Sequence, residues 1–489
     1  MLKKIRTVLA AVLFVGITLL FLDFTGTLHG WLSWLADIQF LPAVLALNVV
    51  VIVALVLLTL IFGRVYCSVI CPLGVLQDLL ARLNRRRNKY VYSPEKRCLR
   101  YLFLLLFIVT LVGGVGSVWA LLSPYGNYGV IATMLLQPLW MLGNNVLAFL
   151  AERMDSYAFY TVDVWMKSLP LLIFAVVLLI VLTVLSWRGG RTYCNTVCPV
   201  GTVLSWLARF SWLKVHFEED KCRNCSQCSK NCKAACIDYK THTVDYSRCV
   251  ACGNCISHCQ LGALQYGHKT KSSKTSDTPV NPDKRSFLLA TAMATTAAMA
   301  QQKDKVVDGG LAELEDKVAP NRQTPIVPPG SRSLKNMAQH CTGCQLCVSK
   351  CPNDVLRPST DLLHLMQPVM SYERGFCRPE CTRCSEVCPT GSILPIDRAE
   401  KSSVQIGHAV WIKKNCVSVT DGVVCGNCAR HCPTGAIEMV MLNEDDEESP
   451  MVPAVNEQVC IGCGACEYVC PSRPFSAIVV EGHEVHRTI

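Results

Sequence analysis

The chemistry of this chain is carried by cysteines that recur at short, regular intervals. CRNCSQCSKNC and CVACGNCISHC, between residues 222 and 259, both have the spacing Cys-x-x-Cys-x-x-Cys-x-x-x-Cys. Three thiolates in one loop can bind three corners of an iron–sulfur cube, and in two-cluster ferredoxins the fourth ligand comes from the other motif. The spacing predicts one 4Fe–4S cluster on Cys222, Cys225, Cys228 and Cys259, and another on Cys249, Cys252, Cys255 and Cys232.

Four further sets follow in the C-terminal part, and in each the last cysteine precedes a proline, as in bacterial ferredoxins. They are Cys341, Cys344, Cys347, Cys351; Cys377, Cys381, Cys384, Cys388; Cys416, Cys425, Cys428, Cys432; and Cys460, Cys463, Cys466, Cys470. The outer two sets have regular spacing and the middle two are stretched at their first cysteine. This symmetry suggests that the outer sets share one ferredoxin-like fold and the middle sets another.

Zinc binding and disulfide formation are the alternative uses of these cysteines. Zinc sites usually bring ligand pairs together across a spacer, and disulfide scaffolds are short secreted chains. Here 24 of the 30 cysteines of a 489-residue chain fall into six sets of four, which favours about six 4Fe–4S clusters. Cys236 is an alternative ligand to Cys232, although the spacing favours Cys232. Cys98 falls in no set.

A second kind of cysteine motif occurs twice nearer the N-terminus. FGRVYCSVICPLG and GGRTYCNTVCPVG share the pattern Gly-Arg-x-Tyr-Cys-x-x-x-Cys-Pro-x-Gly. Spacing of i, i+4 puts each cysteine pair on one helical face, although Pro72 and Pro199 limit how far a helix persists. The four residues can share one metal or redox site, or they can be small buried packing residues or a reducible disulfide pair. They are Cys67, Cys71, Cys194 and Cys198.

The elements that must position these motifs begin with apolar segments. The hydrophobic fraction is 51% and the charged fraction 17%, which places the chain among membrane proteins. We expect four crossings, at about residues 7–22, 41–62, 102–122 and 168–187, with residues 128–150 lying on or dipping into the outer surface. Arginines and lysines follow the second and fourth crossings, so the positive-inside rule puts the N-terminus and residues 63–100 in the cytoplasm. The net charge of +10 is explained by these loops and carries no nucleic-acid signature.

The membrane motifs and the two-cluster ferredoxin motif that follows them, over about residues 1–268, resemble the NapH subunit of periplasmic nitrate reductase systems. NosR and CcoG proteins share the Cys-x-x-x-Cys-Pro motifs. The C-terminal part resembles NapG and related MauM-type ferredoxins, which carry four clusters behind a twin-arginine signal. One departure is that Cys232 and Cys259 are followed by Lys and Gln rather than Pro. The resemblance implies electron flow from the quinol pool or a cytoplasmic donor towards a periplasmic reductase or cytochrome.

The segment between the NapH-like and NapG-like parts of the chain suggests how the C-terminal part could be exported to the periplasm. Residues 283–302, DKRSFLLATAMATTAAMAQQ, resemble a twin-arginine export signal with Lys284 where an arginine is usual, and a short amphipathic linker helix is the alternative. We therefore expect a membrane domain at 1–212, a two-cluster ferredoxin domain at 213–268, a linker at 269–340 and a four-cluster domain at 341–489. The fold class is an α-helical membrane domain joined to α+β ferredoxin-like domains.

This organisation predicts a multi-pass protein of the bacterial inner membrane. The first ferredoxin domain is expected in the cytoplasm and the C-terminal one in the periplasm. The leading hypothesis is an electron-transfer subunit; the alternative is an accessory or assembly factor that supplies electrons for maturation of another metalloenzyme. A stand-alone catalyst is disfavoured, because the chain has no dinucleotide-type Gly-rich motif and no Cys-x-x-Cys-His haem attachment.

Overall fold

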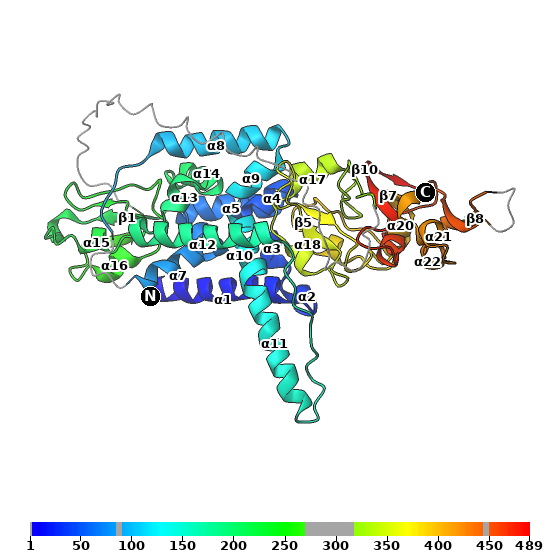
Figure 1. Cartoon of the computed structure of the whole chain (residues 1–489). Helices are drawn as coiled ribbons and strands as arrows, with labels where there is room; N and C mark the ends of the chain where they lie inside the picture. Colours follow the sequence, from blue (N-terminus) through cyan, green and yellow to red (C-terminus); the bar gives the residue numbers. More distant parts are fainter. Residues whose placement is uncertain (1, 85–89, 269–316, 444–448) are drawn as a thin grey trace, which may run out of the picture.

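The structure is a computed structural model that describes residues 2–84, 90–268, 317–443 and 449–489. It has three parts in a row: a helical bundle in the middle, a small cysteine-rich unit at one end, and a larger one at the other (Figure 1). The bundle contains the N-terminal helices, and the small unit follows it in the chain. The export-signal prediction at 283–302 and most of the predicted linker lie outside the described residues.

Several helices run lengthwise between the two cysteine-rich units (Figure 1). The principal ones are α1 (Leu2–Leu22), α5 (Val49–Phe62), α7 (Pro72–Leu83), α8 (Arg97–Val112) and α12 (Leu169–Gly189). Among the residues that the structure describes, three segments are long and apolar enough to cross a membrane, namely Lys3–Leu22, Pro124–Glu152 and Leu169–Gly189, which is consistent with a membrane protein. The crossings expected at 7–22 and 168–187 therefore each correspond to one long helix.

The two other expected crossings are each broken into two helices. Residues 41–62 form α4 (Phe40–Leu45) and α5, with Leu47 in the left-handed region between them and the Asn48 side chain accepting from the Val51 amide to begin α5. Residues 102–122 form α8 and α9 (Gly116–Leu122), and Gly114 has φ +71° at the break. The sequence analysis did not predict these breaks, because residues 41–62 and 102–122 carry no charge and form continuous, mostly apolar runs.

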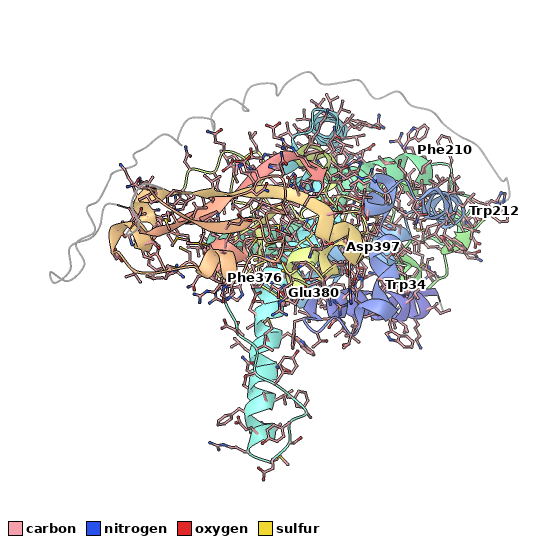
Figure 2. The ribbon with its side chains drawn as sticks, turned by 90° about the vertical axis from the view of Figure 1, so that its right-hand side faces the viewer. Trp34, Phe210, Trp212, Phe376, Glu380 and Asp397 are labelled. Carbon is pink, nitrogen blue, oxygen red and sulfur yellow. The ribbon has the colours of Figure 1, made fainter. Side chains whose placement is uncertain are left out.

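The stretch expected at the outer surface, residues 128–150, is divided between two environments. α10 (Pro124–Ile131) is wholly buried in the bundle. A π-helical turn over Ala132–Leu136 and Pro138 follow, and α11 (Gln137–Glu152) then leaves the bundle at a steep angle (Figures 1 and 2). Proline and π-turns are the usual causes of such bends. The expectation of a surface position is wrong for α10, and α11 alone is free of the bundle.

The cysteine-rich units are built from two-stranded antiparallel sheets and single-turn helices. In the first unit β1 (Lys214–Phe217) pairs with β4 (Leu264–Gly267), and β2 (Ile237–Asp238) with β3 (Thr243–Val244). In the C-terminal unit the pairs are β5 (Leu356–Pro358) with β6 (Pro368–Met370), β7 (Val404–Trp411) with β10 (Ile478–Thr488), and β8 (Ile437–Met441) with β9 (Met451–Val455). Such small elements bury little on their own, so the cysteine loops between them form much of the core.

The C-terminal unit packs against the end of the bundle through an intimate contact. Asp23, just after α1, forms an ion pair with Lys350 at 2.6 Å, and both side chains are almost fully buried. A Cβ added to Gly126 or Gly129 of α10 would overlap the carbonyl oxygens of Thr342 and Cys344. The glycines of α10 therefore let the first C-terminal cysteine loop approach the helix backbone closely.

We expect Gly129→Ala to make the docking of the C-terminal unit on the bundle less favourable by about 1–3 kcal/mol of free energy, because the added methyl group must displace the Cys344 carbonyl. The measurement is hydrogen exchange at residues 341–351 in detergent-solubilised protein, which should become faster. Gly143→Ala on α11 is the matched control. No atom lies within 4 Å of its added Cβ, so hydrogen exchange at residues 341–351 should be unchanged in this variant. Equal exchange in the two variants would contradict the close packing of α10.

Candidate iron–sulfur centres

The cysteine loops have a backbone conformation that points amide groups towards a common centre. In the four regularly spaced sets, the residues before and after the second cysteine are left-handed, with φ between 49° and 78°. These residues are Asn224 and Ser226, Ala251 and Gly253, Gly343 and Gln345, and Gly462 and Gly464. Successive turns of this kind form concave nests of N–H groups that bind anions, including the sulfurs of iron–sulfur sites. Four of the eight are not glycine, and strain of about 1–3 kcal/mol at each is typical of functional loops.

A single-turn helix follows each loop and carries the third cysteine of its set. These helices are α15 (Gln227–Lys230), α16 (Asn254–His258), α18 (Leu346–Ser349), α19 (Arg383–Glu386), α22 (Asn427–Arg430) and α23 (Ala465–Tyr468). They pack in pairs: α15 against α16, α18 against α19, and α22 against α23. Within each pair the chain runs from one cysteine set through a β-hairpin to the other, so three two-site units are formed.

In the first unit, the structure brings together the cysteines that the spacing predicted. Cys222, Cys225, Cys228 and Cys259 line one cavity, and Cys249, Cys252, Cys255 and Cys232 line a second. The fourth cysteine of each motif thus faces the other motif. The ligand assignment itself stays a prediction.

Cys236 also lies at the second cavity. Its sulfur is 3.5 Å from that of Cys232, and it forms another hydrogen bond with Cys249. The hydrogen bond with Cys236 lowers the pKa of Cys232 to about 7, whereas the pKa of Cys236 is raised well above its usual value. Both sulfurs therefore lie at the cavity and share a hydrogen bond, and the preference for Cys232 as the ligand rests on its spacing in the motif.

The C-terminal sets pair differently from the expectation. Cys377, Cys381 and Cys384 line a cavity with Cys351 of the first set, and Cys416, Cys425 and Cys428 line another with Cys470 of the fourth. Cys388 in turn lies within electrostatic range of Cys341, Cys344 and Cys347, and Cys432 of Cys460, Cys463 and Cys466.

The predicted pairing of outer with outer and middle with middle sets is therefore wrong. Consecutive sets pair, one regular with one stretched, because the β5–β6 and β8–β9 hairpins fold each set back on its neighbour. The two units meet where the Cys377 amide donates to the Cys463 carbonyl at 2.9 Å.

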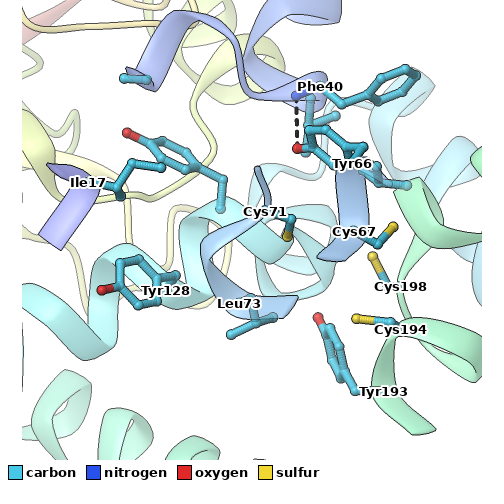
Figure 3. Close-up of a cluster of buried hydrophobic side chains, with 14 of the residues drawn as sticks. Ile17, Phe40, Tyr66, Cys67, Cys71, Leu73, Tyr128, Tyr193, Cys194 and Cys198 are labelled. Atoms are coloured by element: carbon cyan, nitrogen blue, oxygen red, sulfur yellow. Dashed lines mark hydrogen bonds between the residues drawn. The ribbon is translucent and has the colours of Figure 1, made fainter. Parts of the chain in front are cut away.

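The four cysteines of the N-terminal repeat also come together. Cys67, Cys71, Cys194 and Cys198 are buried in the bundle and lie in one region, although the two halves of the repeat are far apart in sequence (Figure 3). None of the four forms a disulfide. Cys98, by contrast, is exposed on α8.

Buried cations near the cysteines are functional candidates that the sequence reasoning missed. Lys401 of α20 (Arg398–Ser403) donates to the carbonyls of Arg378 and Cys381. Burial raises the pKa of Cys377 to about 11, and the positive charge of Lys401 opposes part of that increase. Lys233 lies within electrostatic range of Cys252. Only their positions near cysteines in the sequence could have indicated them, because lysine is normally exposed.

In the part of the chain that the structure describes, no three His, Cys, Asp or Glu side chains lie close enough together to bind a single metal ion. A tetrahedral zinc site holds its sulfurs about 2.3 Å from one ion. The cysteines of the sets instead line cavities, which is the arrangement that a cube with four corner irons requires.

Comparison with known sequence families gives three matches. Residues 44–90 and 169–218 match a family described as 4Fe-4S binding domain; residues 245–355 and 423–473 match two families described as 4Fe-4S dicluster domain. The last match contains the fourth C-terminal set and the last three cysteines of the third, Cys425, Cys428 and Cys432, and these two sets pair in the structure. The match at 245–355 joins two sets that lie on opposite sides of the helical bundle, so they do not form one unit here (Figure 1).

Characterised and uncharacterised relatives agree with these matches. The methylamine utilization ferredoxin-type protein MauM of Methylobacillus flagellatus is 30% identical over 166 residues, which are 33% of this chain and 70% of MauM. The ferredoxin-type protein NapG of Escherichia coli K12 is 30% identical over 178 residues, 33% of this chain and 75% of NapG. An uncharacterized protein of Methanocaldococcus jannaschii, MJ0749, is 28% identical over 236 residues, 47% of this chain and 75% of that protein.

No solved structure matches the chain. The two dicluster matches nevertheless include four of the six cysteine sets in whole or in part, and the alignments to MauM and NapG cover most of those two proteins. Three 4Fe–4S domains and this homology give one conclusion: the chain belongs to the ferredoxin-type electron-transfer proteins that include NapG and MauM.

Proposed function

We propose that this protein is a membrane-anchored polyferredoxin that relays electrons through its 4Fe–4S clusters, about six in the ferredoxin units, from one side of a membrane to the other. The observation that carries the proposal is the reach of α1. Lys3 at its start donates to Ser257 of the first unit, and Asp23 just past its end pairs with Lys350 of the C-terminal unit. A helix of 21 residues is about 30 Å long, the thickness of a bilayer core.

The charge distribution supports the same arrangement. Of the described residues in the basic regions, Arg6 and Arg191 lie at the first unit's end of the bundle, where they and Lys233 of that unit surround Asp78. The first ferredoxin unit is then cytoplasmic and the C-terminal unit periplasmic, in the bacterial inner membrane. The domain division is the NapH-like one up to residue 268, followed by the NapG-like part.

A cavity at the C-terminal end of the bundle favours quinol as a second donor, which would reduce the C-terminal unit directly, in addition to electrons that cross the bundle from a cytoplasmic donor. A cavity of about 590 Å³ lies between the bundle and the C-terminal unit, lined by Met141, Trp165, Lys167 and Cys351 among others. Lys167 donates to the carbonyl of Val348, three residues before Cys351, so the cavity wall continues into a cysteine loop. An apolar cavity with a few convergent polar groups suits a quinol ring. Oxidation of quinol to quinone releases two protons and two electrons, and the clusters accept the electrons singly.

The assembly hypothesis remains the second candidate function. In that case the same clusters reduce a metal or thiol in a maturing enzyme. The quinol-side cavity favours the relay, because a maturation factor needs no lipid-soluble donor beside a cysteine loop. A periplasmic reductase or cytochrome is then the acceptor.

The relay predicts that anaerobically purified protein holds about 24 irons in its ferredoxin units, with matching acid-labile sulfide. Reporters of compartment fused after residues 268 and 489 should lie on opposite sides of the membrane. Reporters on one side, or zinc in place of iron, would contradict it.

Blocking the cavity should slow electron entry. We expect Met141→Trp to reduce quinol-driven cluster reduction by about tenfold, equivalent to about 1.4 kcal/mol, because the larger ring occupies the cavity. Iron content and reduction by dithionite should be unchanged. Met154→Trp is the matched control, since Met154 is 80% exposed beyond α11 and outside the cavity. Quinol-driven rates that are equal in both variants would remove the cavity as the donor site.

A further inference from the structure

The two Cys-x-x-x-Cys-Pro repeats form matching halves of one structure. Each gives a short helix, α6 (Tyr66–Val69) or α13 (Thr192–Thr196), followed by a helix that begins at the proline, α7 or α14 (Pro199–Ala208). In both halves the glycine after the proline lies against the backbone of the first cysteine: a Cβ on Gly74 would overlap the Cys67 carbonyl, and one on Gly201 the Cys194 carbonyl. The Pro-x-Gly sequence is therefore needed for the turn itself.

The arginines of the repeats link the halves. Arg64 donates to the carbonyl of Cys194 at 3.1 Å and lies 3.8 Å from the sulfur of Cys67. Arg191 makes the reciprocal bond to the carbonyl of Cys67. Each arginine thus fixes the first cysteine of the other repeat, which brings both cysteine pairs to one place.

The thiols are surrounded by donors. Gln77 donates to the sulfur of Cys194 at 3.3 Å, and the Gly201 amide donates to the sulfur of Cys198 at the same distance. Cys198 lies within electrostatic range of Cys67, Cys71 and Cys194. Donors of this kind orient and tune the thiolate ligands of iron–sulfur clusters. Packing residues have no need of them.

Charge around the site is unbalanced. The Arg64 side chain is fully buried, and in the described residues no carboxylate pairs with it. Asp78 is the one carboxylate that faces Arg191, Lys233 and Arg6, so positive charges are in excess here. Burying unpaired charge is costly. A cluster held by four thiolates carries net negative charge and would balance this excess.

The position of the site also matches a relay. One buried cluster of side chains contains the four cysteines together with Cys252 of the first ferredoxin unit, and Cys344 and Cys347 of the C-terminal unit pack against it. Tyr66 lies within electrostatic range of Cys71, and Tyr125 of Cys344, so aromatic side chains occupy the space towards the C-terminal unit. Packed side chains therefore connect the two ferredoxin units through the four-cysteine site.

We propose that Cys67, Cys71, Cys194 and Cys198 together ligate a further 4Fe–4S cluster inside the membrane domain. It accepts one electron from one ferredoxin unit and passes it to the other, with no change in bonding. The inference rests on the proposed function, because only a relay across the bundle needs a carrier at this place. A disulfide in the same position would exchange electrons in pairs, which does not match single-electron centres on either side.

The test begins with the intact wild-type protein, purified anaerobically in detergent. Iron and sulfide analysis with Mössbauer spectroscopy should give about 28 irons per chain rather than about 24. About 24 would overturn the inference and leave the relay intact. No iron–sulfur content at all would overturn the proposed function, so the two failures are distinct.

Variants then assign the additional cluster. Cys67→Ser combined with Cys194→Ser should remove about four irons, and abolish transfer between the units while each unit still accepts electrons from dithionite. Cys98→Ser, at an exposed cysteine, should change nothing. If the double variant does not fold, Gln77→Leu retains all four thiols and should lower the reduction potential of one cluster signal, because the donor to the sulfur of Cys194 is lost. Unchanged iron content in the double variant, or unchanged potentials in Gln77→Leu, would overturn the inference.

Discussion

The attachment of the first ferredoxin unit to the bundle depends on one buried carboxylate. Asp78 of α7 is contacted by Arg6 of α1 at 3.5 Å, by Arg191 after α12 at 3.0 Å, and by Lys233 of the ferredoxin unit at 3.0 Å. Burial alone would raise the pKa of Asp78, but Arg191 and Lys233 hold it well below its usual range. The carboxylate therefore stays ionised and joins three elements that the chain order keeps apart. Removing it would leave buried cations without a counter-charge, which is the costly way to break such a network.

A second buried ion pair joins the C-terminal unit to the other end of the bundle. Asp23 and Lys350 form a buried pair beside Cys351, whereas Arg374 and Asp163 form an exposed pair across the same boundary at 3.1 Å. Exposed pairs contribute about 0–1 kcal/mol, so the docking of the C-terminal unit rests mainly on the buried pair and on the close packing of α10. The helical bundle is thus held between the two cysteine-rich units by one buried acidic residue at each end.

Cysteine loops that face the bundle are more buried than the loop with Cys225 in the first unit. Cys225 is exposed and lies in the first unit at one extremity, while α21 (Val417–Thr420) and α22 lie at the other (Figure 1). The loops that face the bundle, with Cys252 and Cys341, are buried. Buried centres exchange electrons within the protein, and the outer loops are where soluble partners can approach. Exposed aromatic side chains such as Trp34, Phe210 and Trp212 lie on one flank of the bundle (Figure 2), as in the aromatic belts of membrane proteins.

The sequence by itself determined the six cysteine sets and the two long helices α1 and α12 of the bundle, and it predicted that Cys232 and Cys259 are exchanged between the two motifs of the first unit. Ligand spacing and apolar length are local properties, and they can be recognised without knowing the fold. The tertiary structure decided which C-terminal sets pair, because hairpins bring Cys388 and Cys351 to neighbouring loops. It also broke two expected crossings at Leu47 and Gly114. Only the folded chain shows that Arg64 and Arg191 each bind the backbone of the other repeat, because the partners of these buried charges are distant in sequence.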